Sequence, residues 1–235
     1  MNYIVLNGIN SNTLTGLLIQ SLPPITLPMI RTQVDEIDGR DGDIVTRLGY
    51  AAYDKEITIG LYGNFNINAV IAYFAASEGN VIFSNEPDKV YRYQVNEQVD
   101  FERLLRYRTA TVTFHVQPYK YSATEQSLVF DDLTGITEVE VTNSGNTTAK
   151  PTLTIYGSGD ISISLDDVQI FEIALGSEEY ISIDVAALEA FKGDTLKNRL
   201  VTGDIANFVL NKGVNTISWT GTITEIDISN YSRWI

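Results

Sequence analysis

The sequence predicts a mainly β protein built from two β-sandwich domains. Isoleucine, valine and threonine together contribute 67 of the 235 residues, and these β-branched side chains fit a pleated, half-buried sheet better than a helix. Apolar and polar residues alternate with a period of two in many short segments, which is typical of strands with one buried face. The charge also shifts near mid-chain, from 10 Lys+Arg against 13 Asp+Glu over residues 1–121 to 6 against 17 over residues 122–235.

The first half contains three clearly alternating segments. In each of them apolar side chains occupy every second position, so one face of each predicted strand is buried. The predicted strands cover residues 56–61, 91–95 and 110–116. They indicate a sandwich or barrel.

One helix is predicted between the first two of these strands, at about residues 66–79. Ile67, Val70, Ile71 and Phe74 recur at i, i+3, i+4 and i+7, which places them on one helix face. Gly79 is suited to end the helix, since glycine readily adopts the left-handed conformation found after helix C-termini. The first domain is therefore a β-sandwich with one packed helix.

Small and polar residues predict the boundary between the domains. Ser122, Ala123 and Thr124, followed by turn chemistry at residues 131–135, favour a connection rather than a strand. The predicted domains are thus residues 1–124 and 125–235. In the second domain, short strands separated by turn residues are typical of a β-sandwich. They cover residues 139–141, 153–155, 161–165, 168–170, 181–185, 217–219 and 226–228.

The composition excludes several classes of protein. Without cysteine there is no disulfide scaffold, thiolate zinc site or cysteine nucleophile. A net charge of −14 argues against a duplex-DNA reader, which needs clustered basic side chains. No segment approaches the roughly 18 apolar residues of a membrane span, and the first residues lack the basic region of a signal peptide. We expect no membrane insertion.

The sequence contains no recognisable catalytic or metal-binding motif. His115 is the only histidine, so any Ser-His-Asp triad would depend on it, and its place in a predicted strand is typical of a surface or interface residue. Residues 35–43 alternate acidic residues and glycine like a calcium loop, but no glutamate occupies position twelve when counted from its acidic residues. We expect a non-enzymatic protein without metal or cofactor.

Two charged clusters are candidates for contacts between protein subunits. One is the acidic, glycine-rich segment 35–43 with the nearby Arg47, and the other is a basic, aromatic segment around Tyr107. Arginine pairs bidentately with carboxylates, which suits both clusters to a protein interface. The candidate interface residues are Asp35, Glu36, Asp38, Arg40, Asp41, Asp43, Arg47, Arg103, Arg106 and Arg108.

Two aromatic residues of the second domain are candidates for saccharide contact. The rings of Tyr180 and Trp234 are of the type that stacks on sugars. Trp219 is in phase with Ile217 and is predicted to lie in the core. Trp234 is next to the last residue, so both an exposed ring and a docked terminal strand remain open.

Several segments, taken in order, resemble the distal tail proteins of long-tailed, non-contractile bacteriophages. The resemblance covers nearly the whole chain and depends on the order and spacing of the segments. The segments are DEIDGRDG at residues 35–42, the strand and helix that start at residue 55, FHVQPYKY at 114–121, VTNSGN at 141–146, KPTLTIYG at 150–157, NKGVNTI at 211–217 and SRWI at 232–235.

The resemblance implies a first domain similar to a tail-tube β-sandwich and a second similar to a galectin or a carbohydrate module. It implies a structural virion protein at the tail tip or baseplate, which forms a homohexameric ring that can also stack back to back in solution. Its implied partners are the tail tube protein, a tail-associated fibre or lysin hub protein and receptor-binding proteins, and phage DNA would pass through without specific binding.

The family has no catalytic residues to carry over to this chain. Segment 35–43, with Arg40 and Arg47, is implied to act in ring assembly or tube docking. Two alternatives remain: a carbohydrate-binding adsorption module that recognises cell-wall saccharide, and, with less support, an enzyme that acts on cell-wall glycan.

Overall fold

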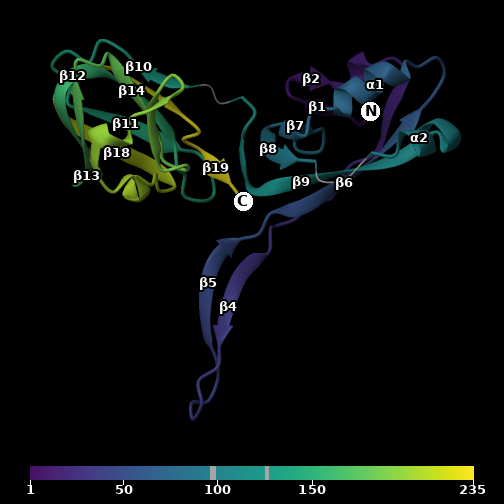
Figure 1. The fold of residues 1–235 in the computed structure, drawn as a ribbon, viewed down its shortest axis with the longest axis horizontal. Helices are drawn as coiled ribbons and strands as arrows, with labels where there is room; N and C mark the ends of the chain where they lie inside the picture. Colours follow the sequence, from purple (N-terminus) through teal and green to yellow (C-terminus); the bar gives the residue numbers. More distant parts are fainter. Residues whose placement is uncertain (96–98, 125–126) are drawn as a thin grey trace. The chain divides into compact units, whose positions relative to one another are not determined.

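The computed structural model describes residues 1–95, 99–124 and 127–235, and it is mainly β, which confirms the predicted fold class (Figure 1). The chain divides into two compact units, Met1–Ala123 with Ile235 (unit 1) and Thr124–Trp234 (unit 2). Glu125, the first residue of the predicted second domain, lies outside the described residues. Each unit buries its own cluster of apolar side chains.

Unit 1 is built on one antiparallel sheet. Its strands are β1 (Ile4–Leu6), β2 (Ile9–Asn10), β3 (Leu17–Ser21), β6 (Tyr53–Leu61), β7 (Glu78–Phe83), β8 (Lys89–Gln94) and β9 (Thr109–Ser122). They pair in the order β2-β1-β7-β8-β9-β6-β3, and a 3₁₀ turn spans Ser11–Thr13. As the alternation predicts, Ile57, Ile59, Val112 and Phe114 point to one face and are buried.

The predicted helix is α1 (Ile67–Phe74). It begins after Asn66, whose side chain accepts hydrogen bonds from the backbone amides of Asn68 and Ala69, and Tyr73 on its buried face donates to the carbonyl of Ile4 at 3.2 Å. The helix ends at Phe74, earlier than the predicted residue 79, because the chain already enters β7 at Glu78.

A second helix, α2 (Phe101–Tyr107), is absent from the sequence prediction, which gave unit 1 one helix. Seven residues make too few turns for a clear apolar period, and only Leu104 is buried among them. Its local signals are nevertheless present. Asp100 caps the first turn by accepting from the backbone amide of Arg103 at 2.8 Å, and Arg108 ends the helix in the left-handed conformation.

Replacing Asn66 with alanine is expected to lower the free energy of unfolding of unit 1 by about 1 kcal/mol, because two amides of α1 lose their side-chain acceptor. Urea denaturation measures the change. Asn66→Asp is the control, since aspartate is an equally good cap. An alanine variant as stable as the wild type would contradict this role of Asn66.

Unit 2 has two sheet layers that share two long strands. Its strands are β10 (Leu128–Phe130), β11 (Glu138–Asn143), β12 (Thr152–Leu165), β13 (Val168–Gly176), β14 (Tyr180–Asp184), β15 (Glu189–Lys192), β16 (Thr195–Leu196), β17 (Val201–Gly203) and β18 (Gly213–Ser229), with 3₁₀ turns at Asn198–Leu200 and Ile205–Asn207. The short strand β19 (Arg233–Trp234) is not part of these layers. The first half of β12 pairs with β14 and its second half with β13. β18 likewise pairs first with β11 and then with β10.

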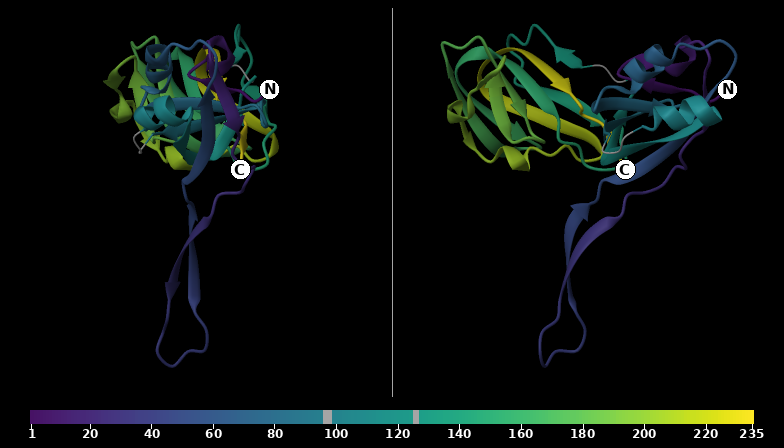
Figure 2. Two further views of the ribbon diagram at one scale, coloured as in Figure 1. Left: turned by 90° about the vertical axis from the view of Figure 1, so that its right-hand side faces the viewer. Right: turned by 45° about the vertical axis from the view of Figure 1, so that its right-hand side comes forward.

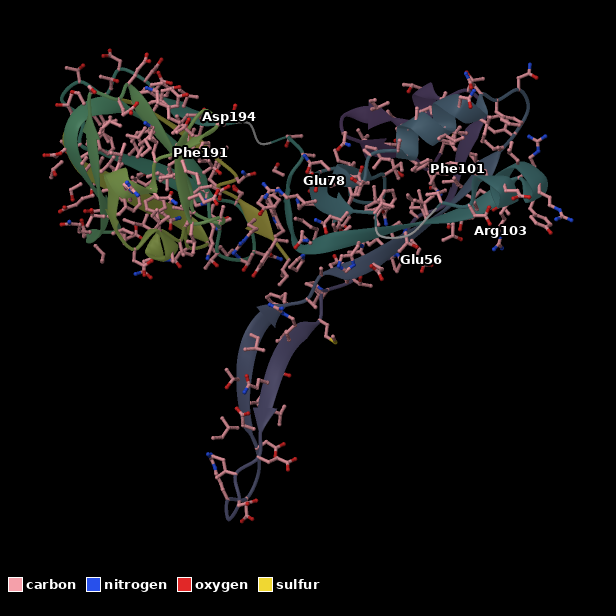
Figure 3. The ribbon with its side chains drawn as sticks, viewed as in Figure 1. Glu56, Glu78, Phe101, Arg103, Phe191 and Asp194 are labelled. Carbon is pink, nitrogen blue, oxygen red and sulfur yellow. The ribbon has the colours of Figure 1, made fainter. Side chains whose placement is uncertain are left out.

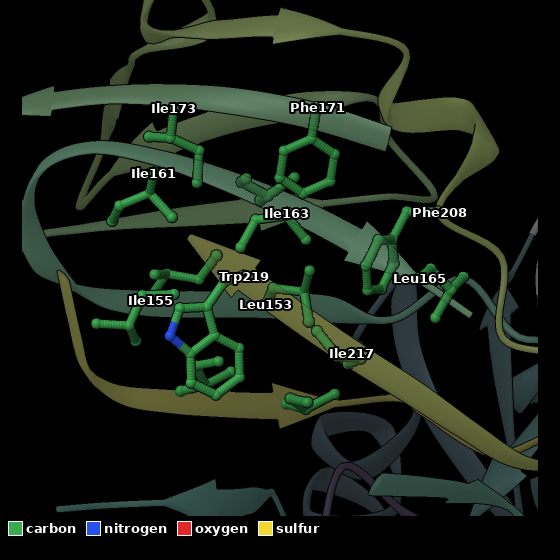
Figure 4. Close-up of a cluster of buried hydrophobic side chains, with 14 of the residues drawn as sticks. Leu153, Ile155, Ile161, Ile163, Leu165, Phe171, Ile173, Phe208, Ile217 and Trp219 are labelled. Carbon is green, nitrogen blue, oxygen red and sulfur yellow. The ribbon is translucent and has the colours of Figure 1, made fainter. Parts of the chain in front are cut away.

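The shared strands bend where their pairing register shifts, near Gly157 in β12. A Cβ atom on Gly221, in the facing part of β18, would lie only 2.3 Å from the carbonyl oxygen of Asp160, so only glycine fits. Strands that change layer in this way are known from packed sheets. Between the layers lies a core that includes Phe171, Phe208 and the predicted core residue Trp219 (Figure 4).

Two buried asparagines close loops at the edge of this core. Asn143 donates to the carbonyls of Thr147 and Leu210 at 2.9 and 3.2 Å and accepts from the amide of Gly145 at 2.9 Å. Asn215 donates to the carbonyls of Asn211 and Gly213. These residues belong to the VTNSGN and NKGVNTI segments, so both segments contribute to the structure of unit 2.

Candidate functional site

The most exposed feature of unit 1 is a β-hairpin, which we call the arm (residues 30–50). Among the residues that the structure describes, its strands β4 (Ile30–Asp35) and β5 (Ile44–Tyr50) pair only with each other, and both views of Figure 2 show it as a separate two-stranded ribbon. Nearly all of its residues are exposed. The arm lacks the support that the other strands of unit 1 obtain from packing on a core. An isolated two-stranded hairpin is only marginally stable in water.

One face of the arm, which we call its apolar face, carries an apolar pair at each end. Ile30 lies opposite Tyr50 and Val34 opposite Val45, with Thr32 and Arg47 paired between them, and the two valines are 52% and 61% exposed. The other face carries the polar pair of Gln33 and Thr46 and, nearer the turn, Asp35 opposite Ile44. Soluble proteins seldom leave such an apolar face in water unless a partner covers it.

The root of the arm is fixed to the body of unit 1. Lys55 donates from Nζ to the carbonyl of Pro24 at 2.9 Å, and Asn85 donates to the carbonyl of Pro23 at 2.9 Å. At the returning strand, the ring of Tyr50 packs edge-on against Tyr119, with 6.0 Å between centroids. The chain is therefore anchored at Pro23 and Pro24, shortly before the arm begins, and again at Tyr50, the last residue of the arm.

Lys55 is buried in an aromatic cage. Its Nζ lies 5.0–5.9 Å from the ring centroids of Tyr53, Phe83 and Tyr91, and burial lowers its pKa despite the nearby Glu86. Glu86 accepts from Lys120 Nζ at 3.0 Å and from the Tyr91 hydroxyl. Burial, with the Glu86 carboxylate second, also raises the pKa of Tyr53 to about 12. The network is structural, because it binds the root of the arm to the sheet.

The acidic residues singled out from the sequence lie at the end of the arm, in a loop that we call the tip (residues 35–43). Every side chain of the tip is exposed, and a turn is closed by the amide of Arg40 donating to the carbonyl of Ile37 at 3.2 Å. The predicted interface residues Asp35, Glu36, Asp38, Arg40, Asp41 and Asp43 all belong to it. Within the described residues, no three Asp, Glu or His side chains gather as a metal site would require.

Arg47 is not part of the tip. It lies on β5, where its guanidinium donates to the Tyr50 hydroxyl and lies 4.9 Å from the centre of that ring. Arg47 therefore lies on the same face of the arm as Tyr50. The sequence analysis grouped it with the acidic segment 35–43, but in the structure its side chain contacts Tyr50 instead.

The other three predicted arginines gather at α2, which we call the arginine cluster (Arg103, Arg106 and Arg108; Figure 3 labels Arg103). Arg106 lies over the ring of Tyr107 and Arg108 over that of Phe65, with 5.4 and 4.5 Å to the ring centres. Beside α2 is an open hollow of about 520 Å³, whose lining includes Arg103, Arg106 and Tyr107 together with the acidic Asp100 and Glu102. Tyr107 itself is 61% exposed.

His115 lies on the exposed face of the sheet of unit 1. Its Nδ1 is 2.6 Å from Asp54 Oδ1, and the cross-strand row continues through Gln94 to Glu78. Glu56 projects from the same face two residues after Asp54 (Figure 3). Asp54, Glu56 and Glu78 are acidic side chains of this face. It also carries the basic Arg92, whose guanidinium lies 4.5 Å from the centre of the Tyr121 ring.

The two candidate saccharide residues lie in unit 2. Tyr180 begins β14, and its ring already contacts Tyr156, at 5.2 Å between centroids, and Lys192 Nζ, at 5.0 Å. Lys192 is paired in turn with Glu178 at 3.1 Å. Trp234 belongs to the short strand β19 and is partly buried. The described residues contain no helix of the length and apolarity needed to cross a bilayer.

Residues 9–116 match the family model of the phage tail protein RIFT-related domain, and this stretch contains the arm, α1 and α2. No curated protein matches the sequence.

Solved structures extend the similarity over the whole chain. The SPP1 Dit (gp 19.1) protein, described as a paradigm of the hub adsorption apparatus of phages that infect Gram-positive bacteria, has a TM-score of 0.71 at 14% identity and is covered over 100% of both chains. A chain of the phage P2 baseplate in its activated conformation with Ca has a TM-score of 0.59 at 10% identity, covering 100% of this chain and 97% of that one. The resemblance to siphophage distal tail proteins is confirmed at the level of the fold.

Proposed function

We propose that this protein is the structural hub at the distal end of a non-contractile phage tail. In this proposal it forms a homohexameric ring that joins the tail tube protein to a fibre or lysin hub protein and to receptor-binding proteins. Residues 1–124 form the ring, and residues 125–235 face outward as a galectin-like module. The tail domain match and the fold shared with SPP1 Dit support this role.

The observation that carries the proposal is the uncovered apolar face of the arm. Val34 and Val45 form a directly opposed, exposed pair on it, and within the described part of its own chain the arm pairs with no other strand. A second copy of the chain supplies the missing cover. Because the arm of one copy would lie on a different surface of the next, the contact is head-to-tail, and such contacts close into rings.

The exposed face of the sheet of unit 1 is suited to a passage for DNA. Asp54, Glu56 and Glu78 give it an acidic character, and Arg92 is engaged with Tyr121. Acidic side chains repel phosphates, whereas a surface that binds DNA needs clustered basic ones. DNA would therefore pass this face without specific binding.

The saccharide-binding alternative has less support. Contacts with Tyr156 and Lys192 already occupy the ring of Tyr180, so less of that ring is available to a sugar. The proposed structural role requires no catalysis. Among the described residues, the side chain paired with His115 is Asp54, and no serine nucleophile is hydrogen-bonded to this histidine.

The proposal is tested by introducing charge into the arm's apolar face. We expect the wild type to be a hexamer by native mass spectrometry and a ring by electron microscopy. The double variant Val34→Asp with Val45→Asp should weaken association by at least about 100-fold. Each contact would lose the burial of the four methyl groups of the two valines, and two carboxylates would be buried in their place.

Gln33→Asp with Thr46→Asp is the matched control. This pair introduces the same two opposed carboxylates on the other face of the same strands and also removes the hydrogen bond from Gln33 to Asp35, so it strains the hairpin at least as much and should still leave the ring intact. A wild type that stays monomeric at all concentrations would overturn the hub proposal. Equal loss of the ring in both variants would show that the apolar face is not the contact.

A further inference from the structure

We infer that the acidic tip of the arm docks on the arginine cluster of a second copy of this chain, with Ile37 seated beside Tyr107. This inference rests on the proposed ring and names the two surfaces that meet in it. Both surfaces are exposed, both lie in unit 1, and each carries the chemistry that the other lacks.

The charges of the two surfaces are complementary. The tip carries five carboxylates and one arginine, Arg40. The helix α2 and its C-cap carry three arginines, against Glu102 within the helix and Asp100 at its start, and an oxygen of Asp100 is already used by the amide of Arg103. No described ion pair involves a side chain of either surface. Arginine is the cation best suited to carboxylates, since its guanidinium pairs bidentately.

The apolar groups also match. Ile37 is 49% exposed in the middle of the acidic tip, where its two chain neighbours are the acidic residues Glu36 and Asp38. Across from it, Tyr107 and Leu105 are exposed on α2, and Tyr107 borders the hollow of about 520 Å³, which has room for an isoleucine side chain. Tyrosine and arginine around a seated apolar side chain are the usual composition of interface centres.

The arm is long enough to make this contact between copies. β4 has six residues, which span about 20 Å as an extended strand. At this length the charged tip can reach the surface of a neighbouring copy. The hydrogen bonds at Pro23 and Pro24 fix where the chain leaves the body of unit 1. Exposed ion pairs add little individually, so we assign the charges mainly to orientation and association rate.

Cysteine crosslinking tests the pairing directly, because the chain contains no cysteine. Two single variants, Ile37→Cys and Tyr107→Cys, are purified separately, mixed and oxidised. We expect a disulfide-linked heterodimer in high yield from the mixture and none from mixing Ile37→Cys with Val129→Cys, whose cysteine lies at an equally exposed position of unit 2. Equal yields from both mixtures would overturn the inference.

Charge reversal gives a second measurement. Arg103→Glu with Arg106→Glu, or Asp38→Lys with Asp41→Lys, should each slow ring assembly at least 10-fold at low salt, and a chain carrying all four changes should recover to within about 3-fold. Failure of the combined variant to recover, with each pair harmful alone, would contradict the pairing.

The two proposals can fail separately. If Val34→Asp with Val45→Asp abolishes the ring but neither the crosslink nor the charge reversals show an effect, the ring stands and the tip docks elsewhere, which overturns this inference alone. If the wild type forms no ring but the heterodimer still crosslinks specifically, the pairing stands and the hexameric hub does not.

Discussion

Replacing Lys120 with methionine is expected to lower the free energy of unfolding of unit 1 by about 3–5 kcal/mol. Lys120 is paired with Glu86 at 3.0 Å, and the two side chains are only 7% and 13% exposed. Methionine fills much of the same space but leaves the buried Glu86 carboxylate without its ion-pair partner, with the Tyr91 hydroxyl and the charge of Lys55 still near it. Losing the partner of a buried charge costs far more than an exposed ion pair contributes.

The measurement must report on unit 1 alone. Both tryptophans lie in unit 2, so their fluorescence does not follow the change, and hydrogen exchange of the β9 amides is the suitable probe. Lys192→Met in unit 2, followed by tryptophan fluorescence, is the control, because its pair with Glu178 is two to four times as exposed, and its loss should cost much less than the loss of the Lys120 pair. A Lys120→Met variant within about 1 kcal/mol of the wild type would contradict the buried-pair argument.

Removing both charges separates the two contributions. Glu86→Gln in the Lys120→Met background should recover part of the lost stability, because no buried charge remains unpaired. The same network contains Lys55, which anchors the root of the arm through Pro24. We therefore expect hydrogen exchange in the arm to rise in Lys120→Met before the sheet itself opens.

The fold class could be predicted from the sequence because strand alternation is a local signal. Ile57 and Ile59 alternate with polar residues in the sequence and are buried in the structure. The arm carries the same local signal, since Ile30, Thr32 and Val34 share one face. Alternation alone does not reveal that this face has no cover in its own chain, because a buried strand and an unpartnered one show the same pattern.

The candidate interface residues were predicted from their charge, but which of them lie close together could be seen only in the structure. Residues 35–43 stay close because they form one loop, whereas the guanidinium of Arg47 packs on the ring of Tyr50. The sequence also missed α2, because its seven residues bury only Leu104. Its capping residue Asp100 was the available signal, which becomes meaningful only once a helix is assumed after it.

Replacing Asn143 with leucine is expected to lower the free energy of unfolding of unit 2 by about 3 kcal/mol or more. Asn143 is 1% exposed, and its amide serves the carbonyls of Thr147 and Leu210 and the amide of Gly145. Leucine has a similar size but no polar atoms, so these buried backbone groups lose their partner, each at a cost of about 1–3 kcal/mol.

The loop around Asn143 has little freedom to adapt to this loss. A Cβ atom on Gly145 would lie 1.9 Å from the carbonyl oxygen of Arg233, so the backbone there is already in close contact with the C-terminal strand. Urea denaturation followed by tryptophan fluorescence measures the change, since Trp219 lies in the core of unit 2. Thr142→Val, at the exposed neighbouring position, should stay within about 0.5 kcal/mol of the wild type.

A leucine variant within about 1 kcal/mol of the wild type would show that water or a shifted backbone satisfies the freed groups. The expected large loss instead gives the VTNSGN segment a physical role. Asparagine supplies the hydrogen bonds that the sheet cannot provide at this end of β11, and glycine permits the close approach of Arg233. A segment that resembles a functional family can thus mark the closure of a fold, and the functional surfaces must be sought where the side chains remain unpaired.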